Sequence, residues 1–224
     1  MFNLKVRKIK KINTKNRIVK GSFPSKTLLK CVKQIDKYQN SNILGQQPVL
    51  WKRAKNFSIY DSNNNKWIDF SSSIFVANVG HGNKKIISTI KKNADRLLHA
   101  YSYPTHERAK YLKKLIKFIP NYLNSATLLN SGTEAAERAI KISRLYGLNF
   151  KKNKKIIVGY FGNYHGKTLG SAMLSGETKD THWVGYRDPN IFRLKFPYPW
   201  LINSKKIAQI LLLSLLVDNI FLCS

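Results

Sequence analysis

The sequence contains few cysteines, glycines and prolines and no early apolar run. Its two cysteines, Cys31 and Cys223, form neither a metal-ligand spacing nor a disulfide framework, so we expect a reducing compartment. Twelve glycines and seven prolines are too few for a collagen-like or low-complexity chain. No long uncharged apolar run precedes residue 200, and the first 20 residues are too densely charged for a signal peptide. These absences predict a globular, cytoplasmic protein that does not bind a membrane.

Acidic residues are also scarce: the chain has 11 of them and 40 lysines and arginines, which gives a formal net charge of +29. Such an excess is typical of proteins that bind nucleic acid or an anionic surface, and residues 5–20 form an arm without an acid. The remaining lysines stand between apolar residues, as they do on solvated helix faces. Lysine also outnumbers arginine, whereas proteins that recognise phosphate groups favour arginine. We therefore do not expect nucleic acid as a partner.

Hydrophobic periodicity predicts an α/β protein. Alternating runs at 49–51, 58–61 and 66–70, with asparagines at 63–65, predict a β-hairpin or meander. Helical spacing predicts helices over 84–98, 107–119 and 134–146. Buried strands predicted at 126–129 and 155–160 flank the last of these helices, which indicates a βαβ unit and a parallel sheet.

Two loops expected at the same sheet edge carry candidate chemistry. Ser131 and Glu134 have the spacing of a helix capping box, which alone explains that pair. The same helix start directs the backbone N–H groups of Gly132 and Thr133, with the Thr133 hydroxyl, toward a position that favours an anion such as phosphate. After the next strand, Tyr164 stands between glycines and offers a flat ring for stacking. Together the loops predict a site for a phosphorylated aromatic cofactor.

A series of short motifs follows in a fixed order from about Gln46 to Trp200. They are Pro48-x-Leu50-Trp51-x-Arg53-Ala54, Ile59-Tyr60-Asp61, Trp67-Ile68-Asp69, Asn78-Val79-Gly80-His81, Leu129-Asn130-Ser131-Gly132-Thr133-Glu134-Ala135-Ala136-Glu137 and Tyr164-His165-Gly166-x-Thr168-Leu169-Gly170. This series resembles the class III pyridoxal-phosphate aminotransferases, which include the 4-aminobutyrate, ornithine and acetylornithine enzymes. The resemblance implies part of a fold type I, aspartate-aminotransferase-like domain, with an N-terminal β-hairpin segment and an incomplete parallel or mixed sheet.

The resemblance also implies a reaction and a set of site residues. Pyridoxal 5'-phosphate is the implied cofactor, and the implied reaction moves an amino group from an amine or omega-amino acid to a 2-oxo acid in a homodimeric enzyme. The implied residues are, for the cofactor, Ser131, Gly132, Thr133, Tyr164 and His165, and, for the substrate channel, Ile74. Three serines at 71–73 replace the small residue and glycine that commonly precede this last position in the family.

The family's Schiff-base lysine, and the aspartate that contacts the pyridine nitrogen, lie further along the chain than this sequence extends. We therefore assign no catalytic residue and expect a fragment that holds half a cofactor site and is inactive alone. Two alternatives stay open. One is a catalytically inactive, basic protein that binds nucleic acid or another anion on the same scaffold. The other is one half of a split aminotransferase, with the missing residues on a partner chain.

Four segments are expected along the chain. They are a basic arm and helix (1–45), a segment with the hairpin and first helix (46–105), the first part of the cofactor-binding domain (106–200) and an apolar tail (201–224). The tail does not resemble the family and is too short and too interrupted for a membrane span. It is expected to be a helix left without its partners, or the product of a frameshifted or prematurely ended reading frame.

Overall fold

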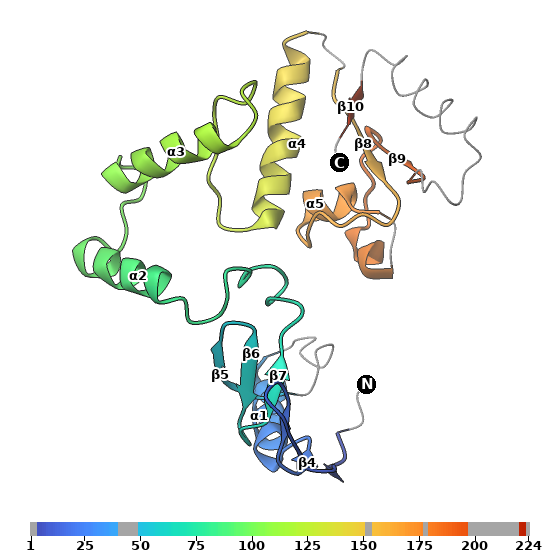
Figure 1. The fold of residues 1–224 in the computed structure, drawn as a ribbon. Coiled ribbons are helices and arrows are strands. Elements are labelled where there is room, and N and C mark those ends of the chain that lie inside the picture. Colours follow the sequence, from blue (N-terminus) through green and yellow to red (C-terminus); the bar gives the residue numbers. More distant parts are fainter. Residues whose placement is uncertain (1–3, 40–48, 151–153, 177–178, 197–219, 223–224) are drawn as a thin grey trace, which may run out of the picture. The chain divides into compact units, whose positions relative to one another are not determined.

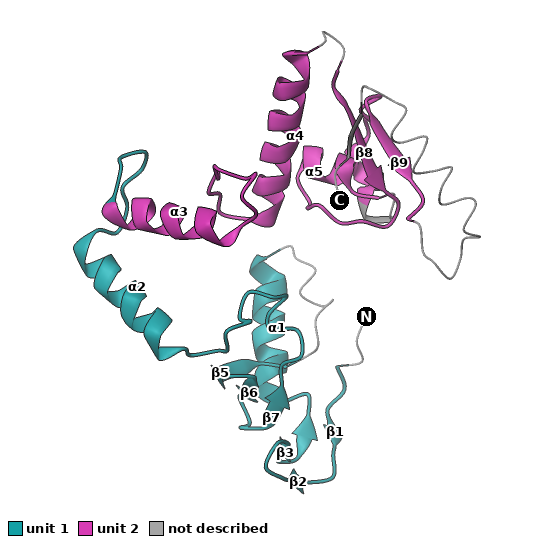
Figure 2. Cartoon of the chain, turned by 45° about the horizontal axis from the view of Figure 1, so that its top comes forward, with its two compact units in different colours: residues 1–105 teal, residues 106–224 magenta. Residues whose placement is uncertain are grey.

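The computed structural model describes residues 4–39, 49–150, 154–176, 179–196 and 220–222. The chain forms two compact units, residues 1–105 and residues 106–224 (Figure 2). The division of the sequence into four segments stays a prediction.

The first unit contains an antiparallel sheet that the hairpin motifs build. Its five strands pair in the order β2-β3-β7-β6-β5, and residue 59 on β6 stands opposite residue 67 on β7. A separate two-stranded pair joins β1 to β4. The bounds are β1 (Arg7–Lys8), β2 (Ile12–Asn13), β3 (Ile18–Val19), β4 (Ser22–Phe23), β5 (Trp51–Lys55), β6 (Ser58–Asp61) and β7 (Lys66–Ile68). The predicted hairpin or meander is confirmed.

The basic arm is folded to a greater extent than its sequence indicates. Four strands of two residues each lie within residues 7–23, and β3 pairs with β7 through Ile18 and Lys66. Strands this short carry no readable alternation, which is why the sequence shows only an arm. Helix α1 (Lys26–Tyr38) then begins after Ser25, whose side chain accepts a hydrogen bond from the Leu28 N–H. Its residues Leu28 and Val32 are buried, as the amphipathic spacing there requires.

The turn between β6 and β7 is organised by one buried carboxylate. The Asp61 Oδ1 accepts hydrogen bonds from the backbone N–H groups of Asn63 and Asn65, each at 2.9 Å. Its Oδ2 accepts from the Asn65 side-chain amide at 2.7 Å and from the Trp67 indole at 3.0 Å. The Asp61 residue is only 4% exposed, so these four donors replace the water that the carboxylate loses.

The loop after β7 contains a left-handed turn. Ser72, Ser73, Ile74 and Phe75 all have φ between +48° and +70°, a region that costs a residue other than glycine about 1–2 kcal/mol. A hydrogen bond of 2.8 Å between the Asp69 Oδ2 and the His81 Nε2 closes the loop, and it lowers the pKa of Asp69 below its ordinary value. Helix α2 (Lys84–Arg96) follows, capped by the Asn83 side chain.

The second unit is built on a parallel sheet with the order β10-β8-β9 (Figure 1). Its small core joins Ile140 of α4, Ile157 of β8 and Leu174 of α5, with Ile191 of β9 packed against them. The elements are α3 (His106–Phe118), α4 (Gly132–Leu148), β8 (Ile156–Tyr160), α5 (Leu169–Leu174), the 3-10 helix η2 (Lys179–Val184), β9 (Ile191–Leu194) and β10 (Ile220–Leu222). The predicted helices over 84–98, 107–119 and 134–146 and the strand over 155–160 are confirmed to within a few residues.

The strand predicted at residues 126–129 is wrong. Residues 126–129 form no strand, and Leu128 and Leu129 are 45% and 43% exposed, so α4 is not the crossover of a βαβ unit between 126–129 and β8. A strand needs a neighbour to satisfy its backbone, and the sheet of this unit gives residues 126–129 none. At the other end, residues 220–222 form β10, parallel to β8, so the helical alternative for the tail does not hold at these three residues, and the alternative of a frameshifted or prematurely ended reading frame stays a prediction. Residues 201–219 of the tail lie outside the described part.

No helix in the described part of the chain is long and apolar enough to cross a bilayer.

Asp61→Asn tests the role of the buried carboxylate. The asparagine amide matches its size, but in either orientation its NH₂ group faces two of the four donors. We expect a loss of about 2–3 kcal/mol in the free energy of unfolding, measured by urea denaturation followed by circular dichroism and tryptophan fluorescence. Asp36→Asn, which removes an exposed carboxylate from α1, is the matched control. A difference between the two variants below about 0.5 kcal/mol contradicts this role.

Candidate functional site

The first turn of α4 forms the capping box that the sequence predicts. The Ser131 hydroxyl accepts a hydrogen bond from the Glu134 N–H at 3.2 Å, and the Glu134 carboxylate accepts from the Ser131 N–H at 2.9 Å. This box leaves the N–H groups of Gly132 and Thr133, the first two helical residues, without an acceptor inside the helix. No other backbone acceptor is assigned to either N–H within the described residues. The helix start therefore presents two free donors and a hydroxyl.

The loop that follows β8 lies directly against this helix start. Gly166 has φ +137°, and a Cβ placed on it would overlap the Thr133 hydroxyl of α4 and the Ser171 hydroxyl of α5. Only glycine allows the loop backbone to come this close. The contact confirms that the two loops singled out in the sequence lie together, although the strand expected before α4 is absent.

His165 is held inside this loop. Its backbone N–H donates to the Ser175 hydroxyl at 2.9 Å, and its Nε2 lies 2.7 Å from the Asn163 side-chain amide. Burial lowers the pKa of His165 below 6.5. Burial thus favours the uncharged imidazole, and its contacts with Ser175 and Asn163 give the residue a structural role in the loop.

Two predicted site residues are exposed. Tyr164 is 70% exposed, so its ring does not belong to the hydrophobic core and remains available for stacking. Ile74 is also 70% exposed and lies in the left-handed turn of the first unit. Tyr164 and the helix start of α4 share the second unit, whereas Ile74 belongs to the other unit. Its assignment to a substrate channel stays a prediction.

One charged residue next to these loops, Glu137, was not predicted from the sequence. Its Oε1 accepts hydrogen bonds from the Thr168 hydroxyl at 2.5 Å and from the Ser171 N–H at 3.0 Å. The motif contains Glu137, but no local pattern indicates these partners, which stand 31 and 34 residues further along the chain.

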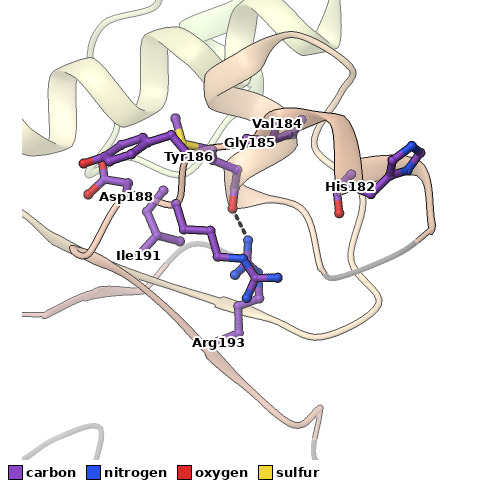
Figure 3. A pocket seen from close by; sticks show the side chains of 11 residues that line it. His182, Val184, Gly185, Tyr186, Asp188, Ile191 and Arg193 are labelled. Carbon is purple, nitrogen blue, oxygen red and sulfur yellow. Dashed lines mark hydrogen bonds between the residues drawn. The ribbon is translucent and has the colours of Figure 1, made fainter.

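A cavity of about 770 Å³ lies elsewhere in this unit, among α5, η2 and β9 (Figure 3). None of the predicted site residues lines it. Arg193 donates to the carbonyl oxygens of Met173, along the dashed line in Figure 3, and of Ser175, while Asp188 on its wall pairs with Arg144 at 2.7 Å. These charged groups hold α5, β9 and α4 together, so they have a structural use that requires no ligand.

Sequence comparison relates the chain to known enzymes. A family model described as aminotransferase class-III matches residues 40–218, beyond the end of the motif series near Trp200. The chain is 31% identical over 183 residues to the acetylornithine aminotransferase of Wolinella succinogenes, covering 80% of this chain and 46% of that protein. It is 30% identical over 162 residues to a leucine/methionine racemase of Thermococcus litoralis, covering 66% of this chain and 35% of that protein. The chain therefore spans less than half the length of these relatives.

The fold of this chain matches part of the fold of several solved structures. An ornithine aminotransferase from Toxoplasma gondii matches 77% of this chain and 41% of its own, with a TM-score of 0.70 and 21% identity. A taurine:2-oxoglutarate aminotransferase from Bifidobacterium kashiwanohense, solved in complex with PLP and glutamate, is also similar. The match covers 81% of this chain and 42% of that protein, with a TM-score of 0.67 and 20% identity. The mixed α/β architecture is therefore that of part of an aminotransferase fold, as the motif series predicts.

Burial of His165 predicts a pH-dependent stability. Because its pKa in the folded chain lies below 6.5, the unfolded chain binds the proton first as the pH falls. Titration of His165 therefore leaves the free energy of unfolding unchanged above about pH 7.5 and lowers it progressively below about pH 6.5. We expect the urea midpoint of the wild type to fall relative to that of His165→Gln between about pH 8 and pH 5.5. A constant difference between the two midpoints contradicts the prediction, since the other histidines titrate in both proteins.

Proposed function

The chain belongs to the class III aminotransferase family, and we propose on this basis that it forms the phosphate-binding part of a pyridoxal 5'-phosphate site. The enzyme containing this site would be a fold type I, homodimeric aminotransferase that moves an amino group from an amine or omega-amino acid to a 2-oxo acid. The observation that carries the proposal is the start of α4, where two free N–H groups and a hydroxyl meet the loop that bears Tyr164 and His165.

The helix start has the donors and the space that a phosphate needs. A Cβ built on Gly132 would meet no atom within 4 Å, so the backbone is open on that side. The amides of Gly132 and Thr133 and the positive end of the helix dipole favour an anion there, and the Thr133 hydroxyl adds a third donor. We propose that these groups hold the phosphate, that Ser131 orients them through the capping box, and that Tyr164 stacks on the pyridine ring.

Pyridoxal phosphate, when bound, supplies an electron-accepting ring for the transfer of the amino group. The residues of this chain bind and orient that ring, and His165, in contact with Asn163 and Ser175, keeps the loop next to Tyr164 in place. We assign no catalytic residue to these 224 residues. The lysine and the pyridine-contacting aspartate of the family would then come from polypeptide that corresponds to the unmatched part of the relatives. Ile74 is proposed to line the substrate channel.

The alternative of a protein that binds nucleic acid through the arm stays a prediction, since Lys8, Lys10 and Lys11 are exposed there.

Binding of pyridoxamine 5'-phosphate tests the proposed site. This amine form lacks the aldehyde that would react with the many exposed lysines, so fluorescence titration of the full chain reports the non-covalent site alone. We expect the wild type to bind it and Thr133→Val to bind about tenfold more weakly, because one hydrogen bond to a charged phosphate is lost.

Thr127→Val makes the same change at an exposed position of the same unit and should leave the affinity unchanged. Absence of binding by the wild type, or equal affinities of the two variants, contradicts the proposed function. The chain alone should also catalyse no transamination, and measurable turnover would contradict the assignment of the lysine to other polypeptide.

A further inference from the structure

The side chain of Glu137 links two helices of the second unit. Glu137 lies four residues after Thr133 in α4, so both side chains are on the same face of that helix. Thr168 and Ser171, which donate to its carboxylate at 2.5 Å and 3.0 Å, are the N-cap and the third residue of α5. The carboxylate thus satisfies an amide at the start of α5 from a neighbouring helix, in the manner of a capping residue.

Two glycines allow the chain before and inside α5 to reach this face of α4. A Cβ on Gly166 would overlap the Thr133 hydroxyl, and a Cβ on Gly170 would overlap the Glu137 carboxylate. The loop and the first turn of α5 are therefore in direct contact with consecutive turns of α4. A side chain at Gly166 would collide with Thr133 and Ser171, and one at Gly170 would displace the Glu137 carboxylate.

The loop that carries Tyr164 is held at both ends of α5. At the start of α5, Glu137 holds Ser171, which is completely buried at 0% exposure. At its end, Ser175, which is 4% exposed, accepts from the backbone N–H of His165. The Tyr164 side chain is 70% exposed and has no core packing to fix it. Its place is therefore set by these backbone anchors.

We infer that Glu137 is a positioning residue for the cofactor site. By holding the start of α5 against α4, it sets where the ring of Tyr164 lies relative to the amides of Gly132 and Thr133. The inference rests on the proposed function, because it concerns the ring of the cofactor whose phosphate those amides are proposed to hold. Glu137 itself contacts α5 and not the cofactor.

Electrostatics alone predicts the opposite effect of removing this residue. The chain carries a net charge of +29, and the loss of one carboxylate makes it more positive, which strengthens the attraction of any anion. Positioning by Glu137 predicts weaker binding of an anion that carries an aromatic ring. The two effects therefore have opposite signs.

The test compares two ligands, pyridoxamine 5'-phosphate and inorganic phosphate, on the full chain. We expect Glu137→Ala to weaken binding of pyridoxamine 5'-phosphate about tenfold and to leave the affinity for inorganic phosphate unchanged, because the helix start remains while the stacking partner is displaced. Glu137→Gln retains an acceptor oxygen and should recover most of the affinity. Gly170→Ala, which displaces the carboxylate, should reproduce the effect of Glu137→Ala.

Asp95→Ala is the charge-matched control, since it removes an exposed carboxylate of α2 and should not change either affinity. Hydrogen exchange of the Ser171 amide, measured without ligand, should speed up in Glu137→Ala. Wild-type affinity in that variant, an equal loss of both ligands, or unchanged exchange at Ser171 overturns the inference. If the wild type binds no pyridoxamine 5'-phosphate, the proposed function fails, and exchange at Ser171 still decides whether Glu137 holds α5.

Discussion

The candidate site depends on the close contact between the loop after β8 and the first turns of α4. Gly166 touches Thr133 there, and Glu137 accepts hydrogen bonds from the start of α5. This contact places the glycine-containing loop next to the start of α4. The arrangement suits a ligand with an anionic end and a flat ring, because helix amides bind the anion and an aromatic side chain from the loop can cover the ring. Without the contact, the two halves of the proposed site would have no fixed separation.

Features with a local cause could be predicted from the sequence. The capping box of Ser131 and Glu134 and the asparagine turn after Asp61 depend on residues within four positions of each other, so their signals are complete in the sequence. The strand expected at 126–129 failed because a strand depends on a neighbour, which the sequence of the strand does not reveal. Glu137 was missed for the same reason, since its partners lie 31 and 34 residues away. The short strands of the arm were missed because two residues show no period.

The basic composition has little part in this site. Lysines at positions 84, 85, 91, 92, 110, 113, 114 and 117 are exposed on α2 and α3, as expected of solvated helix faces. The proposed phosphate contacts are instead backbone amides and one hydroxyl, whose positions are fixed by the helix and not by flexible side chains. Such donors are specific in geometry, whereas scattered lysines attract any anion. The family relationship and the helix start therefore explain the function better than the net charge does.

Amide resonances recorded by NMR during a titration with pyridoxamine 5'-phosphate test the central claim most directly. We expect the largest shifts at the backbone N–H groups of Gly132 and Thr133, with smaller shifts from Tyr164 to Gly166. Shifts that concentrate in the basic arm, residues 5–20, or spread evenly over the exposed lysine helices while those of Gly132 and Thr133 stay unchanged would contradict it.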